Sequence, residues 1–188
     1  MKEKPVAAGK SSFDHIDSEK AFDIMQIRPG SGFLDLACGI GRYSLAVAEK
    51  TQAAQIYAID LWQEGIEALK QESAARQLAN IHALQADMRK PLPLQNAAVQ
   101  HCLLATVLHD LPAADQQNVL REIARVLDND GELSIIEFKK IDHGPGPSID
   151  KRLDSKDLKA LADPLGFIPL TLAELGPYVY IAKFKTKK

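Results

Sequence analysis

Short apolar segments alternate with longer amphipathic ones along most of the chain, and this alternation constrains the fold more than any other feature. Apolar runs bounded by turn residues predict strands at 33–37, 55–59, 81–84, 99–105 and 132–138. Helical spacing of apolar residues predicts helices at 43–50, 64–77, 113–127 and 155–162. Strands that alternate with helices form a mostly parallel sheet covered on both faces, so the predicted fold class is α/β, doubly wound and Rossmann-like.

The C-terminal end of the chain departs from this alternation. Two β-rich runs, 167–172 and 178–184, are joined by residues 173–177, which are too few for a crossover helix. These strands must therefore be antiparallel, so we expect a seven-stranded, mostly parallel sheet with an antiparallel last strand. Ser155 is the expected N-cap of the helix that precedes them.

The composition is that of an ordinary globular protein. The chain has 188 residues, a formal net charge of −2 and 46% hydrophobic residues, so no overall field draws it to nucleic acid or to an anionic membrane. No apolar run approaches the ~20 residues that span a bilayer. Two cysteines, Cys38 and Cys102, cannot build a disulfide framework, which is typical of a reducing compartment. We therefore expect a cytoplasmic protein with neither membrane nor nucleic acid as its partner.

The domain organisation is expected to be simple. Residues 1–13 read as a loose N-terminal arm, and 14–188 form a single domain. This domain opens with an amphipathic helix at 14–27, with Asp17 or Ser18 as its N-cap. We expect that helix to cover the functional site.

The strongest functional signal is the turn after the first predicted strand. Residues 35–41 read Asp-Leu-Ala-Cys-Gly-Ile-Gly, and the two glycines, Gly39 and Gly41, allow a ligand to approach the backbone closely. A dinucleotide fingerprint would need a third glycine where Ser44 stands. It would also have no use for Asp35, which suits a cationic ligand such as an ammonium group.

Two further carboxylates follow neighbouring predicted strands. Asp60 closes the second strand, where it can accept hydrogen bonds from both hydroxyls of a ribose. Asp87 follows the third strand. Taken singly, each is equally well explained as a helix cap or turn residue. Together with Asp35 they line the crevice at the carboxyl ends of the strands, which suits a nucleoside with a positively charged amino-acid arm.

At these residues the sequence resembles the class I S-adenosylmethionine-dependent methyltransferases, and the likeness covers nearly the whole chain. Three runs are similar to the first, second and adenine-contacting motifs of that family, at 33–41, 57–60 and 86–88. Two others are similar to its ubiquinone- and menaquinone-biosynthesis-type branch, at 94–109 and 120–127. Gly166, Phe167 and the last strand pair look like its reversed seventh strand. One departure is Ala37, which stands where the family usually has glycine.

The resemblance implies a cofactor, S-adenosylmethionine, and an activity, transfer of its methyl group. The residues implied to contact the cofactor are Asp35, Ala37, Cys38, Gly39, Gly41, Asp60, Leu61, Asp87, Met88 and Ala105. Asp35 would help to position the methionine end, and Asp60 would bind the ribose hydroxyls. Asp87 would accept a hydrogen bond from the adenine amino group. Thr106 is the alternative to Ala105 for facing the amino group of the cofactor.

His109 is the candidate catalytic residue. It follows the fourth predicted strand, at a place that faces the transferred methyl group in the resembling family. It is a base, a residue that orients the acceptor, or a surface or capping histidine. The other histidines have no spacing typical of metal ligands, so no metal is predicted.

Several other residues have plainer interpretations. Cys38 is expected to be a small buried residue rather than a nucleophile, and Cys102 a core residue. We expect a solvated edge and tail from four lysines near the C-terminus: Lys183, Lys185, Lys187 and Lys188. The segment 139–154, rich in glycine and proline, follows the carboxyl end of a strand and is expected to be a lid or a substrate loop.

The motifs also limit the methyl acceptor. After the fourth strand the chain lacks the Asn- or Asp-Pro-Pro-aromatic run of enzymes that methylate amino groups of nucleic acids. Neither cysteine follows a proline, as methylation of cytosine carbon 5 requires, and two thiols are too few for arsenic methylation. A small molecule is therefore the expected acceptor. The alternatives are a non-catalytic S-adenosylmethionine-binding module, a nicotinamide-dependent oxidoreductase and a structural domain with an empty crevice.

Overall fold

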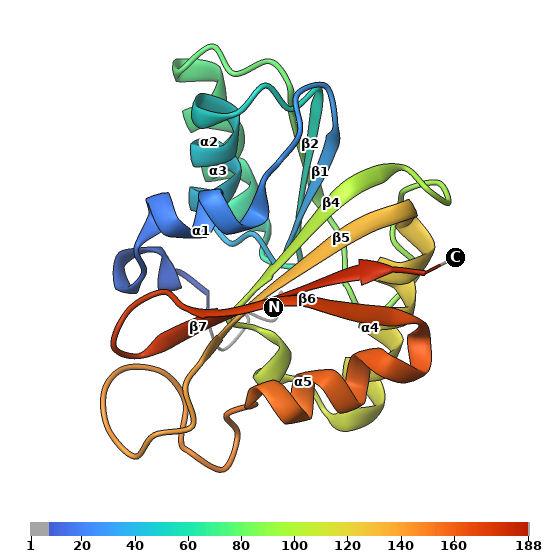
Figure 1. Ribbon diagram of the computed structural model, residues 1–188. Coiled ribbons are helices and arrows are strands. Elements are labelled where there is room, and N and C mark those ends of the chain that lie inside the picture. Colours follow the sequence, from blue (N-terminus) through green and yellow to red (C-terminus); the bar gives the residue numbers. More distant parts are fainter. Residues whose placement is uncertain (1–7, 188) are drawn as a thin grey trace.

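A computed structural model, which describes residues 8–187, shows one seven-stranded sheet with helices on both faces (Figure 1). The strand order is β3-β2-β1-β4-β5-β7-β6. Strands β1 to β5 run parallel, and β7 is antiparallel to both β5 and β6. The strand bounds are Gly32–Leu36, Gln55–Asp60, Ile81–Gln85, Val99–Ala105, Leu127–Phe138, Phe167–Glu174 and Val179–Thr186 for β1 to β7. The predicted α/β fold with a reversed strand at its end is confirmed.

The helices divide between the two faces of the sheet (Figure 1). Helices α1, α2 and α3 pack on one face, with bounds Ser18–Met25, Arg42–Lys50 and Gln63–Ala75. Helices α4 and α5 pack on the other, with bounds Ala113–Val126 and Ser155–Ala162. Three short 3-10 helices, η1 to η3, span Ser12–His15, Leu108–Asp110 and Asp163–Leu165. Within residues 8–187, no helix has the length and apolar character needed to cross a membrane.

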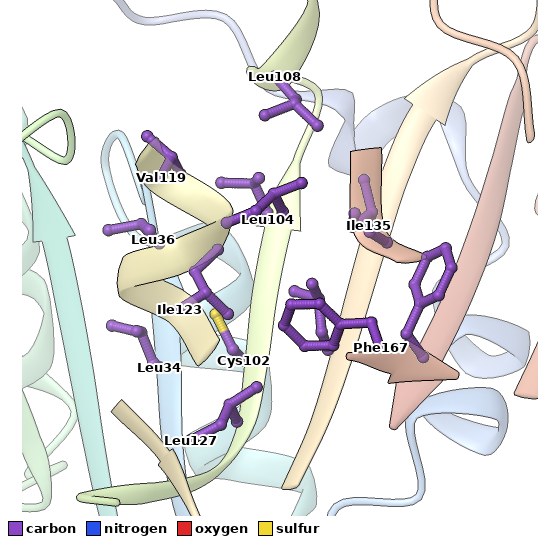
Figure 2. Close-up of a cluster of buried hydrophobic side chains, with 14 of the residues drawn as sticks. Leu34, Leu36, Cys102, Leu104, Leu108, Val119, Ile123, Leu127, Ile135 and Phe167 are labelled. Carbon is purple, nitrogen blue, oxygen red and sulfur yellow. The ribbon is translucent and has the colours of Figure 1, made fainter. Parts of the chain in front are cut away.

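The larger part of the core lies between the sheet and α4. Figure 2 shows side chains from β1, β4 and β5 meeting the apolar stripe of α4, which includes Val119 and Ile123. Cys102 lies within this cluster at 1% exposure, as expected for a core residue. Helix α4 shows that stripe because its apolar residues recur at helical spacing, which places them on one side. The packed centre of the sheet provides a rigid base for the loops at its carboxyl edge.

The N-terminal region differs from the single helix predicted over 14–27. It forms η1 and then α1, because Asp17 has an extended backbone and accepts a hydrogen bond from the Lys20 N–H as an N-cap. The helix ends at Met25, because the next residue, Gln26, has a left-handed conformation (φ 50°). Of the predicted arm over 1–13, residues 1–7 lie outside the described part.

Two other local predictions need correction. The N-cap of α5 is Asp154, not Ser155, and its carboxylate forms a capping box with Asp157. The aspartate takes the cap because both it and Asp157 bond to the other's backbone N–H. Strand β5 also begins earlier than predicted, at Leu127, because the chain around Asp130 (φ 66°) stays within the strand.

Lys183 is buried rather than part of a solvated edge. Its side chain is 4% exposed, and Nζ donates to the carbonyls of Ile24 and Met25 at 3.0 Å each. Nζ also pairs with Glu132, which contacts the buried His101 (Nδ1 to Oε2, 3.2 Å). The sequence-based interpretation was wrong because pairing of β7 within the sheet places Lys183 under the end of α1, where unpaired carbonyls attract a cation.

Candidate functional site

The turn between β1 and α2 is built from residues with left-handed backbones. Ala37, Gly39 and Gly41 have φ values of 63°, 59° and 76°. A Cβ atom at Gly39 would meet nothing within 4 Å, whereas one at Gly41 would lie 2.4 Å from a methyl carbon of Leu69. The two glycines therefore differ in role: Gly41 lets α2 pack on α3, and Gly39 leaves open space above the turn.

Asp35 lies inside β1, directly beneath this turn, and is 1% exposed. Its Oδ2 accepts hydrogen bonds from the backbone N–H of Ser44 at 3.1 Å and from the Ser44 hydroxyl at 2.6 Å. Burial raises the pKa of this carboxyl to about 6, against the opposing effect of the two Ser44 bonds. Asp35 makes no ion pair with any residue of 8–187. It is a buried acid that a cation would stabilise in its charged form.

Asp60 joins the end of β2 to the glycine turn. Its Oδ2 accepts a hydrogen bond from the Gly39 N–H at 2.8 Å, and its Oδ1 accepts one from the Trp62 N–H at 2.7 Å. A carboxylate has about four lone-pair positions, so each oxygen can still accept a further donor. Asp60 thereby sets the shape of the turn and presents free acceptor capacity beside it.

The third carboxylate, Asp87, lies after β3 and is held by Arg89. Two bonds of 2.9 Å join Nε and a terminal nitrogen of Arg89 to the two carboxylate oxygens. The Arg89 guanidinium lowers the pKa of Asp87 and keeps it ionised. Nearby positions are apolar: Leu61 is 39% exposed, and Met88 is half-buried against the core.

The end of β4 forms the next wall. Ala105 is half-buried and pairs with Ile136 of β5. Thr106 follows with a left-handed backbone (φ 50°), and its N–H donates to the Ile136 carbonyl at 2.7 Å. A β-branched residue in this conformation is strained, which marks a turn whose direction the surroundings impose. The chain then enters η2 and reaches His109.

His109 is buried, so it is not a surface histidine. Its ring Nδ1 lies 2.6 Å from Oε2 of Glu137, a residue with no exposed surface near the end of β5. Burial lowers the pKa of His109, but the hydrogen bond and the charge of Glu137, with a contribution from Asp110, outweigh it and raise the pKa. Sequence reasoning missed Glu137, although an acid between Ile136 and Phe138 in an apolar strand is a detectable signal.

The segment 139–154 is organised around Arg152, a second residue that sequence reasoning missed. Its buried guanidinium donates to the carbonyls of Lys139, Pro145 and Pro147 at 2.9 to 3.1 Å. A Cβ at Gly146 would meet the Phe138 ring at 2.7 Å, so the loop lies directly on that ring. This order fits the wall of a substrate site.

Cys38, the remaining predicted contact, is 9% exposed and faces the α2–α3 layer. Burial, with the nearby charges of Asp35 and Asp60, raises the pKa of its thiol well above the usual value. A thiol in that state is a poor nucleophile, in line with the sequence-based interpretation. No group of three or more metal-ligating side chains occurs in the described chain.

The predicted site residues thus lie along one edge of the sheet. They fall at the carboxyl ends of the parallel strands β1 to β4, where open α/β sheets bind ligands. The open space above Gly39, the cation-seeking Asp35 and the acceptor capacity of Asp60 fit a nucleoside with an ammonium-bearing arm. His109 and Glu137 lie farther along the same edge, at the ends of β4 and β5.

Comparisons with known proteins show what this chain is similar to. Residues 33–131 match the model of a family described as a methyltransferase domain. Demethylmenaquinone methyltransferase of Bacillus cereus (strain ATCC 10987 / NRS 248) is 27% identical over 115 residues, which cover 61% of this chain and 47% of that enzyme. The chain spans about half the length of the curated relatives that it matches.

Solved structures share the fold over nearly the full length. A SAM-dependent methyltransferase from Aquifex aeolicus superposes with a TM-score of 0.82 at 21% identity, covering 97% of this chain and 94% of that one. The cyclase SpnF superposes with a TM-score of 0.78 at 18% identity, covering 90% and 79%. At these identities the likeness concerns the fold alone, and the chemistry has to be argued from the site.

Proposed function

The chain belongs to the methyltransferase domain family, and from this premise we propose that it transfers the methyl group of S-adenosylmethionine to a small-molecule acceptor. The observation that carries the proposal is the glycine turn with its two carboxylates. Gly39 leaves space for a ligand, Asp60 bonds the turn from one side, and Asp35 lies buried beneath it without a cation. A nicotinamide dinucleotide suits this turn less well, because Asp35 would repel its pyrophosphate.

We assign the cofactor contacts by the chemistry of each residue. Asp35 would attract the ammonium group of the methionine arm, and Asp60 would accept hydrogen bonds from the ribose hydroxyls. Asp87 would accept one from the adenine amino group while it keeps Arg89, and Leu61 would pack on the adenine. The Cys38 side chain packs in the α2–α3 layer, so only its backbone would contact the arm. When bound, S-adenosylmethionine supplies a methyl group on a positively charged sulfur that needs no further activation.

The proposed acceptor is small. The almost balanced charge of the chain gives no field for a polyanion, and the curated relatives are named for demethylmenaquinone, a small molecule. The site walls near the acceptor come from the loops after β4 and β5, so these loops set its identity. Both cysteines are free and buried thiols, which supports the cytoplasm as the proposed location.

Calorimetric titration with S-adenosylmethionine, S-adenosylhomocysteine and NAD tests the cofactor. We expect the first two to bind and NAD to fail. Gly39→Arg should abolish binding, because its side chain would occupy the open space above the turn. Gly30→Arg is the matched control, since Gly30 has a similar φ of 76° and equally open surroundings, but precedes β1. Absence of binding to both adenosyl compounds would contradict the proposal.

A methyl-transfer screen separates an enzyme from a module that only binds. The protein would be incubated with radiolabelled S-adenosylmethionine and a panel of small phenols, amines, thiols and carboxylic acids, with Gly39→Arg as the blank. The proposal predicts label in at least one acceptor above the blank. Tight binding with no transfer to any acceptor would support the non-catalytic module instead.

A further inference from the structure

We propose that His109 and Glu137 form a proton-accepting pair on the acceptor side of the site, and that the acceptor therefore carries an ionisable hydroxyl, as a phenol or an enol does. This inference rests on the proposed function and deepens it. His109 is assigned as the base that contacts the acceptor, and Glu137 as the residue that positions it. The pair joins η2 to the end of β5, beside the strand ends that form the cofactor crevice.

Glu137 is placed to hold the His109 ring in one orientation. Its Oε2 lies 2.6 Å from the ring Nδ1, and its Oε1 accepts the His109 backbone N–H at 3.3 Å. Oε2 also accepts the Phe138 N–H at 3.3 Å. A carboxylate that takes a hydrogen bond from Nδ1 keeps the ring proton on that nitrogen. The lone pair of the neutral ring then lies on Nε2.

That second nitrogen is open to a substrate. No residue of 8–187 makes a hydrogen bond to His109 Nε2; its nearest charged neighbour is Asp110 Oδ2, at 3.8 Å. Nε2 is not sealed off, because Asp128 Oδ1 is the only fully enclosed side-chain nitrogen or oxygen without a partner in the described chain.

The surroundings tune this histidine as a base. Glu137 from β5 and Asp110 from η2 act to raise its pKa, while burial and the charge of Lys151, on the loop over 139–154, act to lower it; the net shift is upward. The Phe138 ring packs edge-on against the imidazole, with centroids 5.9 Å apart. A base whose pKa is raised takes a proton more readily from a weak acid.

The chemical step balances with this pair. The hydroxyl oxygen of the acceptor forms a bond to the methyl carbon, and the carbon–sulfur bond breaks with both electrons going to sulfur. The hydroxyl proton moves to His109 Nε2, so the imidazole becomes positively charged beside the Glu137 carboxylate. The positive charge that leaves the sulfur thus reappears on His109, next to an anion already in place. An acceptor without a proton to lose would gain nothing from this arrangement.

Nuclear magnetic resonance of the free protein tests the pair without any substrate. The His109 resonance, identified by its loss in His109→Gln, should show the proton on Nδ1 and a pKa above the usual 6.5. In Glu137→Gln the upward shift of the His109 pKa should disappear, because the amide carries no charge, and Glu137→Asp should restore it in part. A proton on Nε2 in the wild type, or a pKa unmoved by Glu137→Gln, would overturn the pair.

Transfer rates test the substrate class, with phenol and the more acidic 4-nitrophenol as probes and aniline and thiophenol beside them. At mildly alkaline pH, His109→Gln should lower the rate with phenol by about 10²–10⁴-fold. The loss should be much smaller with 4-nitrophenol, which is already ionised. The rate of Glu137→Gln with phenol should lie between those of the wild type and His109→Gln. Its pH–rate profile should be displaced, and its KM for S-adenosylmethionine should be unchanged. Equal losses with both phenols, or transfer to aniline or thiophenol alone, would overturn the proposal.

His101→Gln is the matched control. His101 is also a buried histidine against a glutamate (Nδ1 to Glu132 Oε2, 3.2 Å), but it pairs with Phe33 near the opposite end of the strands. A general effect of removing a buried histidine would change its rates as well, whereas the proposal predicts an unchanged ratio between the two phenols. Calorimetry with S-adenosylmethionine on each of these variants shows separately whether the proposed function itself is lost.

Discussion

Two buried acids stand at comparable places in the sheet, and their surroundings differ. Asp35 is the penultimate residue of β1, and Glu137 is the penultimate residue of β5. They lie on opposite faces, because their neighbours pack into opposite core clusters. Among residues 8–187, Asp35 accepts hydrogen bonds only from the N–H and hydroxyl of Ser44, whereas Glu137 contacts an imidazole that can carry a positive charge.

This difference separates a cofactor half of the sheet edge, which includes Asp35, from an acceptor half, which includes Glu137. Burial destabilises a carboxylate that has no cation beside it, and this raises the pKa of Asp35. Glu137 already has its partner, so its task is to organise a residue of this chain. The cofactor half therefore holds a carboxylate without a cation, which we expect the ligand to supply. The acceptor half holds a carboxylate that already contacts an imidazole of this chain.

The largest expected effect comes from removing Glu137. In Glu137→Ala, three donors lose their acceptor: the His109 ring, the His109 N–H and the Phe138 N–H. We expect the free energy of unfolding to fall by about 3–5 kcal/mol. Asp35→Ala should lower the free energy of unfolding by less, about 1–3 kcal/mol. Only the two Ser44 donors lose their acceptor, and the substitution also removes a buried acid that has no cation beside it. Chemical denaturation at neutral pH measures both, and a larger cost at Asp35 would break the comparison.

The contrast between these two acids also explains what could be predicted from the sequence. Asp35 and Asp60 could be predicted as site residues because they lie in a recognisable strand–turn–helix pattern, in which the spacing along the chain determines which residues lie close together. Glu137 was missed because its partner is 28 residues away in sequence and meets it only through pairing of β4 with β5. The same reason applies to Lys183, whose partner carbonyls in α1 lie 158 and 159 residues away.

The ends of helices and strands could be predicted where the sequence offers one clear boundary, but not where two neighbouring residues suit the same position. The strand over 99–105 was predicted to the residue, because an apolar run is bounded on both sides. The start of α5 was misplaced by one residue, because Asp154 and Ser155 are both good caps and only the reciprocal bond with Asp157 decides. Arg152 could not be assigned from sequence, since its partners are backbone carbonyls of an irregular loop.

The second effect concerns the pH dependence of cofactor binding. If a cation of the ligand pairs with ionised Asp35, that carboxyl must lose its proton on binding. The affinity for S-adenosylmethionine should then be constant well above pH 6 and should fall about tenfold per pH unit below about pH 6. Asp35→Asn should bind more weakly but without this dependence. Calorimetry across the acidic range measures it, and an equally steep fall in Asp35→Asn would count against the ion pair.

The smallest effect concerns the glycine turn. Ala37 has a left-handed backbone (φ 63°), a conformation that costs a residue with a Cβ roughly 1–2 kcal/mol. Ala37→Gly removes this strain but adds flexibility to the unfolded chain, so a net gain of about 0.5–1 kcal/mol is expected. The melting temperature should rise slightly while S-adenosylmethionine still binds. A lower melting temperature would show that the methyl group packs usefully at this turn.

We infer that Asp35 serves the cofactor and Glu137 serves the acceptor. This division is tested most directly by the dissociation constant of S-adenosylmethionine, measured at neutral pH for Asp35→Asn, Glu137→Gln and the wild type. The account predicts that Asp35→Asn weakens binding, because the ligand cation loses its carboxylate. It predicts that Glu137→Gln binds as the wild type does, because Glu137 acts on the acceptor side through His109. Normal binding by Asp35→Asn, or lost binding by a folded Glu137→Gln, would contradict it.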